Sequence, residues 1–355
     1  MTLQQHRDEL ITTAAAIASP GKGLLAADES TGTIGKRFAG VGVENSEANR
    51  RAYRSLLATT EGLGEYISGI ILYEETLFQD AVDGTPIVEH IQQRGIVPGI
   101  KVDMGVQPLA GGLRDETWCT GLSGLQERAA RYYERGARFA KWRAVLRISA
   151  EGAPSPLAIR ENAWGLARYA RTVQEEGLVP IVEPEILMDG DHDIATTASA
   201  QERVLRGVYE ALAENGVLLE GSLLKPSMTT EGASHAEPQT PQQVAEMTLR
   251  TLRRTVPAAM PGILFLSGGL GEEEASLYLD AINRAGRRAP WHLGFSYGRA
   301  LQHSCLIQWG GNNVAAGQKA LMARARANSE ASLGAYQAGS QPSDGESLFE
   351  AGYSY

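Results

Sequence analysis

The chain has little of what several classes of protein depend on. Only two of its 355 residues are cysteines, too few for a disulfide framework and without the C-x-x-C spacing of a metal or redox site. The six histidines are scattered without an H-x-x-x-H pair, so the sequence predicts no metal. No apolar run approaches the roughly 20 residues of a membrane span, and a net charge of −9 gives no electrostatic reason to bind nucleic acid. We therefore expect a soluble protein with reduced thiols.

The amino-terminal segment also lacks the features of a targeting sequence. Residues 1–17 mix acidic and basic side chains with apolar residues at helical spacing, unlike a signal peptide or an acid-poor transit peptide. A bacterial cytoplasm and a plastid stroma, the latter after removal of a presequence, fit this start equally well.

Glycine, by contrast, is abundant: the 40 glycines predict many tight turns between short elements. Short apolar runs recur along the chain, and longer stretches with helical pattern separate them, which is typical of strands joined by crossover helices. We predict eight strands, near residues 23–27, 69–73, 97–102, 139–146, 178–182, 218–224, 263–266 and 291–295. Composition predicts helices at 129–136, 163–176, 199–215, 241–255 and 272–285.

Eight strand–helix units predict an α/β fold, a single (β/α)8 TIM barrel with catalytic groups where the strands end. An open doubly wound sheet is the alternative, which the lack of an early G-x-G-x-x-G turn disfavours. Because no internal linker divides the chain, we expect residues 1–327 to form one catalytic barrel domain. Residues 328–355 are rich in alanine, glycine and serine, which predicts a flexible carboxyl-terminal tail. This tail still ends with apolar and aromatic residues that a purely solvated segment would not need, namely Leu348, Phe349, Tyr353 and Tyr355.

A single lysine, Lys225, ends the apolar run of the sixth predicted strand. An ammonium group must lose its proton to act as a nucleophile, and an apolar wall that destabilises the charged form favours this loss. An isolated lysine of this kind more often only reaches water at the end of a strand. The functional interpretation therefore depends on the charged residues at the other strand ends.

Charged residues are disfavoured inside apolar strands, so those found there are weighed together. They are Asp28 at the end of the first strand, Lys141 and Arg143 on the fourth, and Glu183 and Glu185 on the fifth. A closed barrel would bring them together with Lys225. Lys141 would then disfavour the neighbouring ammonium by repulsion, Glu183 could move protons during imine formation, and Asp28 could accept a hydroxyl proton. The alternative interpretation is structural, as ion pairs that line the barrel.

Two segments near the end of the barrel suit a phosphate. Ser267, Gly268 and Gly269 follow the seventh strand, and Gly298 and Arg299 follow the eighth. Glycines expose backbone N–H groups, arginine offers a bidentate fork, and barrels often hold phosphate after strands seven and eight. A Ser-Gly-Gly triplet alone is more often a turn. The prediction of a phosphate site therefore depends on the position of this triplet after the seventh strand.

From near Ile11 to its end, the chain resembles the class I, Schiff-base-forming fructose-bisphosphate aldolases, with residues 115–119 similar to chloroplast-type members. The motifs that carry the resemblance lie at residues 21–32, 141–143, 182–185, 223–226, 266–269 and 295–300. It implies reversible cleavage of fructose 1,6-bisphosphate to dihydroxyacetone phosphate and glyceraldehyde 3-phosphate, in glycolysis, gluconeogenesis or the Calvin cycle. It further implies a homotetramer, no cofactor, and activity on sedoheptulose 1,7-bisphosphate.

The resemblance also implies roles for individual residues. Lys225 would form the imine, Glu183 would transfer protons with help from Glu185 and Lys141, Asp28 would take the C4 hydroxyl proton, and Tyr355 would protonate the enamine. Ser267, Gly268, Gly298 and Arg299 would hold the phosphate of the ketone half. The other end of the substrate would meet Ser30, Thr33, Lys36, Arg37 and Arg143.

One position departs from the family pattern. Met104 stands where relatives usually carry a lysine that helps to hold the phosphate at the aldehyde end. Its loss would weaken binding of the bisphosphate relative to the 1-phosphate by about 1.5–3 kcal/mol, unless Lys36, Arg37 or Arg143 compensates. Two other functions stay open at this point: a lysine-dependent aldolase or transaldolase for another sugar phosphate, and a catalytically silent sugar-phosphate-binding or scaffolding protein.

Overall fold

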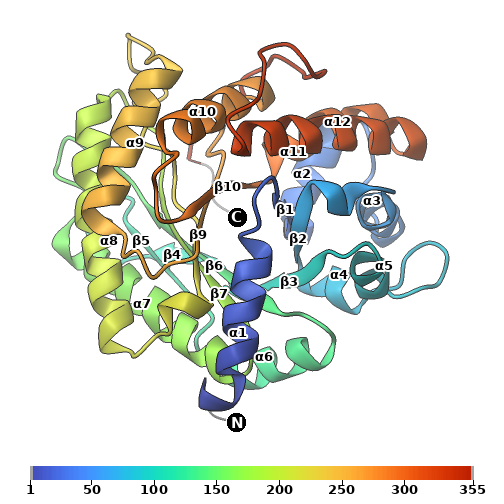
Figure 1. Ribbon diagram of the computed structural model, residues 1–355, viewed down its shortest axis with the longest axis horizontal. Coiled ribbons are helices and arrows are strands. Elements are labelled where there is room, and N and C mark those ends of the chain that lie inside the picture. The colour runs from blue at the N-terminus through green and yellow to red at the C-terminus, as the bar shows by residue number, and fades with distance from the viewer. Residues whose placement is uncertain (1–2, 353–355) are drawn as a thin grey trace.

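The computed structural model describes residues 3–352, in which parallel strands close into a barrel surrounded by helices (Figure 1). The strands follow one another around the barrel in the order β1-β10-β9-β8-β7-β6-β3-β2. Their bounds are β1 (Gly23–Ala27), β2 (Ile67–Leu72), β3 (Val97–Lys101), β6 (Phe139–Leu146), β7 (Val179–Ile186), β8 (Leu223–Leu224), β9 (Gly262–Phe265) and β10 (His292–Tyr297). The predicted TIM barrel is confirmed.

Helices cover the outside of the barrel and one of its ends. They are α1 (Leu3–Ile17), α2 (Thr31–Gly40), α3 (Glu47–Thr59), α4 (Glu74–Phe78), α5 (Ile87–Gln93), α6 (Leu125–Glu134), α7 (Pro156–Glu175), α8 (Ile194–Glu214), α9 (Pro241–Thr255), α10 (Glu272–Ala285), α11 (Arg299–Trp309) and α12 (Val314–Ser332). The 3-10 helices η1 (Leu63–Glu65) and η2 (Leu219–Gly221) and a hairpin of β4 (Val106–Pro108) and β5 (Thr117–Cys119) complete the structure. No helix within residues 3–352 combines the length and the apolar character that crossing a membrane demands.

The first turns of α7 and α8 show how local sequence sets helix boundaries. Both helices begin earlier than composition predicts, because a polar residue caps each of them. The Ser155 side chain accepts a hydrogen bond from the Ala158 N–H, and the Asp193 side chain accepts one from the Thr196 N–H. Each cap satisfies a backbone donor that the helix itself leaves open.

The end of the barrel where the strands begin is apolar. Leu24, Phe139, Ile181 and Leu264 belong to one buried cluster there, together with residues of α1, which lies across this end (Figure 1). Glycine makes room for the largest of these side chains, because a Cβ atom at Gly99 would lie only 2.2 Å from the Phe139 ring. The opposite end of the barrel is open and carries the functional groups described below.

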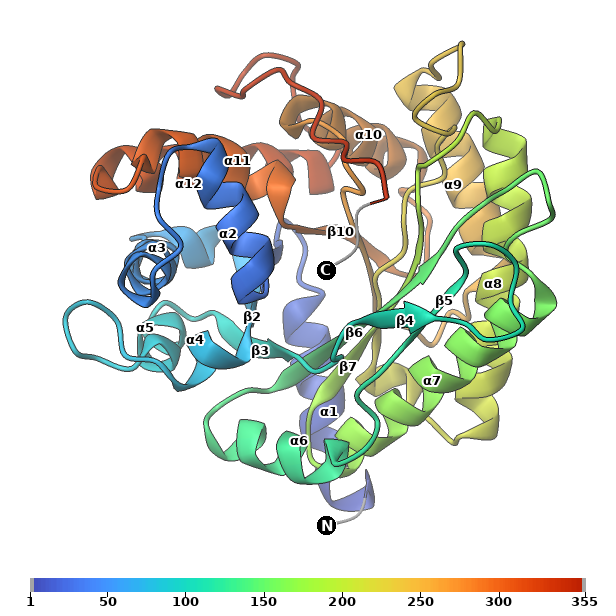
Figure 2. The ribbon, with the colours of Figure 1, turned by 180° about the vertical axis from the view of Figure 1, so that it is seen from behind.

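The carboxyl-terminal segment differs from its predicted bounds. The boundary expected at residue 328 falls inside α12, which continues to Ser332, and the buried Asn328 side chain accepts a hydrogen bond from Ser276 Oγ at 2.9 Å. We call residues 333–352, which follow α12, the tail. The tail runs without helix or strand on the face opposite α1 (Figure 2). Its Leu348 is buried and its backbone N–H donates to the Gly269 carbonyl at 3.1 Å. The flexibility of the tail stays a prediction.

Candidate active site

The predicted functional side chains meet in one cavity at the carboxyl-terminal end of the barrel. Those that line it are Asp28, Arg37, Arg143, Glu183, Glu185, Lys225, Ser267, Gly268, Gly298 and Arg299. Lys141 is completely buried and contacts two of them. Ser30, Thr33 and Lys36 are not among the lining residues: Ser30 caps α2 through the Thr33 N–H, and Lys36 lines a neighbouring cavity under the tail. Tyr355 lies outside the described residues.

Lys225 follows the very short strand β8. Its backbone N–H donates to the Val182 carbonyl at 2.8 Å, which continues the ladder with β7 for one more residue. The residue is 3% exposed, and its Nζ atom lies 3.0 Å from Glu183 Oε1. The lysine is thus held in the barrel with a carboxylate in direct reach of its amino group.

A chain of alternating charges connects Lys225 to the first strand. Lys141 Nζ lies 3.4 Å from Glu183 Oε2 and 2.7 Å from Asp28 Oδ2, so Glu183 bridges the two lysines. All four side chains are buried. Two ammonium groups and two carboxylates balance each other, which meets the requirement that charges removed from water be paired.

The protonation state of Asp28 follows from these neighbours. Burial raises the pKa of the Asp28 carboxyl, but attraction to Lys141 and then to Lys225 outweighs burial and holds this pKa well below its usual range. Asp28 is therefore an anion at neutral pH and is in the form that can accept a proton.

Two charged residues at the end of strand β3 were missed by the sequence analysis: Lys101, its last residue, and Asp103, which follows the strand. Lys101 Nζ lies 2.5 Å from Asp103 Oδ1, and both side chains are buried. Burial raises the pKa of Asp103, but attraction to Lys101 and Lys141 lowers it below its ordinary value. Asp103 also accepts a hydrogen bond from the Arg143 N–H at 3.3 Å. The signal was present, because these residues alternate at a strand end as Lys141 and Arg143 do.

Glu29 is a further buried carboxylate whose importance the sequence did not indicate. It forms ion pairs with Arg37 and with Arg54 Nη1, the latter at 2.8 Å, and it accepts a hydrogen bond from Gln302 Nε2 at 3.0 Å. These contacts join α2, α3 and α11 at the rim of the cavity. Glu29 therefore positions Arg37, whereas Arg143 is positioned by its ion pair with Glu185.

Met104, which the sequence analysis connected with a phosphate, lies outside the lining of the cavity. Its side chain is 66% exposed and is not among the residues that line the cavity. The side chain that β3 buries at this end of the barrel is Lys101, at 8% exposure. The lining of the cavity therefore does not support the expected loss of a phosphate-binding cation at position 104, and the effect of Met104 on substrate preference stays a prediction.

The residues predicted to hold phosphate lie together beside the tail. Gly268 adopts a φ of +62°, which favours glycine, and Gly298 is the residue from which α11 begins. Arg299 donates to the Leu348 carbonyl and lies 3.5 Å from Glu350 Oε1. This end of the cavity therefore presents a helix start and an arginine, and the tail contacts both the arginine and the glycine loop.

Known proteins match this chain over nearly its whole length. Residues 9–355 match the family model for fructose-bisphosphate aldolase class-I. Cytosolic fructose-bisphosphate aldolase 4 of Arabidopsis thaliana is 57% identical, with 98% of this chain and 89% of the relative covered. Chloroplastic fructose-bisphosphate aldolase 1 of the same plant is 54% identical, with 99% and 87% covered. These identities do not distinguish the predicted likeness to chloroplast-type members from a likeness to cytosolic members.

A solved structure has the same fold. Fructose-bisphosphate aldolase from Plasmodium falciparum, in a ternary co-crystal with TRAP and a small-molecule inhibitor, superposes with a TM-score of 0.93 at 53% identity. The match covers 94% of this chain and 97% of that one. Sequence and structure therefore point to one family.

Proposed function

The chain belongs to the class I fructose-bisphosphate aldolase family and is a fructose-bisphosphate aldolase, a lyase that acts on a sugar phosphate, and we propose that it works through a Schiff base on Lys225. The family removes the two other functions that the sequence left open. The observation that carries the proposed mechanism is the 3.0 Å contact between the buried Lys225 Nζ and Glu183. A nucleophile within reach of a proton acceptor is the arrangement that imine formation requires.

The first step joins the enzyme to the ketone. Glu183 takes a proton from Lys225, and the neutral amine attacks C2 of fructose 1,6-bisphosphate to form a carbinolamine. Glu183 then returns a proton to the C2 hydroxyl, which leaves as water, and a protonated imine remains. Lys141 Nζ, 3.4 Å from Glu183 Oε2, holds this carboxyl group in place beside Lys225.

The second step breaks the carbon–carbon bond. Asp28 takes the proton of the C4 hydroxyl, the C3–C4 bond breaks, and its electron pair moves into the protonated imine to give an enamine. Glyceraldehyde 3-phosphate leaves as the aldehyde product. The lowered pKa of Asp28 keeps the carboxylate ready to accept the proton, and Lys141 at 2.7 Å holds it in place.

The third step restores the enzyme. A proton is added to C3 of the enamine, a role we give to Tyr355, which lies outside the described residues. One water molecule then hydrolyses the imine, which releases dihydroxyacetone phosphate and regenerates Lys225. This water replaces the one lost in the first step. The proton that Asp28 took from the C4 hydroxyl replaces the one that Tyr355 gave to C3, so both groups return to their starting forms and the reaction is balanced.

The two phosphates would bind at opposite sides of Lys225. Ser267, Gly268, Gly298 and Arg299 would hold the phosphate of the ketone half, since backbone N–H groups at the start of α11 and a guanidinium both favour an anion. Arg37 and Arg143, which line the cavity, would meet the other phosphate. Arg299 already donates to the tail, so a phosphate has to share or replace that contact.

We further propose a homotetramer, a place in glycolysis, gluconeogenesis or the Calvin cycle, and cleavage of sedoheptulose 1,7-bisphosphate. The seven-carbon sugar differs in its aldehyde half and leaves the chemistry at Lys225 unchanged. Light scattering after size exclusion checks the tetramer, and a coupled assay with each sugar checks the substrates. The two Arabidopsis relatives are named for different compartments, cytosol and chloroplast. The place of this chain in the cell therefore stays a prediction.

Borohydride reduction in the presence of dihydroxyacetone phosphate, followed by peptide mass mapping, tests the mechanism. Reduction converts an imine into a stable secondary amine, so we expect the adduct on the peptide that contains Lys225. The Lys225→Arg variant should carry no adduct, and the matched control Lys319→Arg, at an exposed lysine of α12, should keep it. An adduct on Lys141 or Lys101 instead would contradict the assignment.

A further inference from the structure

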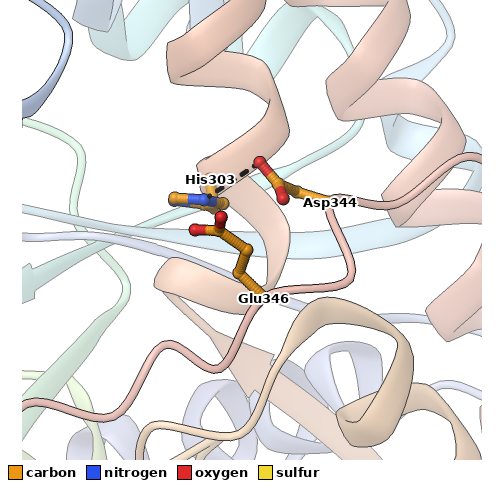
Figure 3. Close-up of side chains that lie close together, drawn as sticks. All are labelled: His303, Asp344 and Glu346. Atoms are coloured by element: carbon orange, nitrogen blue, oxygen red, sulfur yellow. Dashed lines mark ion pairs between the residues drawn. The ribbon is translucent and has the colours of Figure 1, made fainter.

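Outside the catalytic cavity, a histidine and two carboxylates meet between α11 and the tail (Figure 3). His303 belongs to α11, and Asp344 and Glu346 belong to the tail. One ring nitrogen and one oxygen from each carboxylate all lie within 4.8 Å of one another, and His303 Nε2 is 3.3 Å from Asp344 Oδ2. Residues about forty positions apart in the sequence thus direct three metal-binding groups toward one point.

We propose that His303, Asp344 and Glu346 bind one divalent cation of the zinc type, which fastens the tail to α11. Zinc is bound by histidine nitrogen and carboxylate oxygen at about 2.0–2.2 Å, and tetrahedral geometry then separates two ligand atoms by about 3.3–3.6 Å. The distance of 3.3 Å between His303 and Asp344 falls in this range. With a neutral imidazole the three groups carry two negative charges, which match one dication, and water would fill the fourth position.

The histidine nitrogen provides a second, independent indication. Solvent does not reach His303 Nε2, and within residues 3–352 no donor or acceptor meets this atom with hydrogen-bond geometry. A shielded polar atom that lacks a hydrogen bond is costly, and a bound cation would satisfy it. Two of the nearby cations have acidic partners of their own, because Arg37 pairs with Glu29 and Arg299 with Glu350; Lys36 lines the same cavity under the tail.

A buried carboxylate of α10 positions both sides of the site. Glu272, 1% exposed, accepts a hydrogen bond from the backbone N–H of Ser304, which follows His303, at 2.9 Å. It also accepts one from the backbone N–H of Asp344 at 3.0 Å. One side chain therefore fixes the backbone next to the histidine and the backbone of the first carboxylate. Metal ligands are commonly oriented by such outer partners.

Titration of metal-free protein with Co²⁺, followed by its visible absorption and by calorimetry, tests the site. We expect one Co²⁺ per chain, displaced by Zn²⁺, and an affinity at least about tenfold weaker in His303→Asn and in Asp344→Asn. The matched control is His235→Asn, a histidine in the loop before α9, which should bind as the wild type does. Aldolase activity in metal-free buffer should be unchanged in His303→Asn, which shows that this variant is folded.

Hydrogen exchange of the tail amides tests the fastening separately from catalysis. We expect Zn²⁺ to slow exchange in peptides from residues 336–352 of the wild type and to leave the His303→Asn protein unaffected. A wild type that binds no Co²⁺, or binding that is lost in His235→Asn rather than in His303→Asn, would overturn the site. Stoichiometric binding that leaves tail exchange unchanged would overturn the proposed attachment.

Discussion

The two ends of the barrel are built from the same strands but with opposite chemistry. On β6, alternation places Phe139, Lys141 and Arg143 on one face, and all three are buried. Phe139 lies in the apolar cluster beneath α1, whereas Lys141 lies among the carboxylates at the open end. A step of two residues along one strand is therefore enough to pass from an apolar core to a charged site.

The energies at the two ends differ accordingly. Burying an apolar side chain stabilises the fold by about 1.5–3 kcal/mol, whereas burying a charge costs free energy that only pairing offsets. The apolar end should therefore determine stability, and the charged end should determine activity. Substitutions at either end test whether these two properties separate.

The largest effect is expected for Lys225→Arg at the charged end. The guanidinium keeps the positive charge beside Glu183 but does not form an imine, so kcat should fall by at least about 10⁴-fold. The melting temperature should stay within a few degrees of the wild type, because the ion pair is retained. Steady-state kinetics and thermal unfolding measure both. A residual kcat within tenfold of the wild type would show that Lys225 is not the nucleophile.

Glu183→Gln should lower kcat by about 10²–10⁴-fold, because the amide cannot carry the protons of carbinolamine formation. Rapid-quench measurement of imine formation should find this step slowed by the same factor. Glu237→Gln, at an exposed glutamate in the loop before α9, is the matched control and should be unaffected. A slower overall reaction with an unchanged rate of imine formation would assign Glu183 to a later step.

At the apolar end, Phe139→Ala should lower the free energy of unfolding by about 3–5 kcal/mol, because it opens a cavity beside Gly69 and Gly99. The kcat of the protein that remains folded should stay within about twofold of the wild type. Denaturant unfolding and active-site titration separate the two quantities. Phe78→Ala, at a ring that is 46% exposed, should cost less than about 1 kcal/mol. A comparable loss of kcat in Phe139→Ala would mean that the two ends are coupled.

Acid should lower the free energy of unfolding because it protonates paired carboxylates at the charged end of the barrel. The folded pKa of Asp103 is lowered below its ordinary 3.8, so its contribution to stability is complete above that pH and is lost as the pH falls below it. Between pH 4 and 2.5, Asp103→Asn should therefore lose stability less steeply than the wild type, by up to about 1.4 kcal/mol per pH unit. Asp8→Asn, on the exposed surface of α1, is the control and should keep the wild-type slope. Equal slopes in the wild type and Asp103→Asn would exclude this carboxylate as a source of acid sensitivity.

How far the sequence predicted the fold also differs between regions. Strand β6 and helices α9 and α10 have the predicted bounds, because their apolar patterns and end signals agree. Strand β7 was expected to end at Val182 but continues to Ile186, because Glu183 and Glu185 are paired with side chains of β6 rather than exposed. The polar residues after Val182 predicted a strand end there, but their ion pairs with β6 allow the strand to continue.

The site was predictable where charged residues alternate on strands and unpredictable where the contacts are long-range. Alternation along each strand, together with closure of the barrel, predicted that Lys141 and Glu183 meet, and the same pattern would have found Lys101. The contact between Glu272 and Asp344 joins residues 72 positions apart, and no local pattern indicates it. The cluster at His303 was missed for the same reason.

The smallest effect is expected for Met104→Lys. This substitution restores the lysine of the family pattern at a side chain that lies outside the lining of the cavity. Because this side chain is exposed, the ratio of kcat/KM for fructose 1,6-bisphosphate over fructose 1-phosphate should change by less than about twofold. Arg143→Met, at a buried cation that lines the cavity, should lower that ratio by about 1.5–3 kcal/mol, or roughly 10–150-fold. The opposite result, a ratio that responds to residue 104 and not to residue 143, would show that the phosphate lies outside the charged end of the barrel. The contrast between the two ends would then no longer explain where the substrate binds.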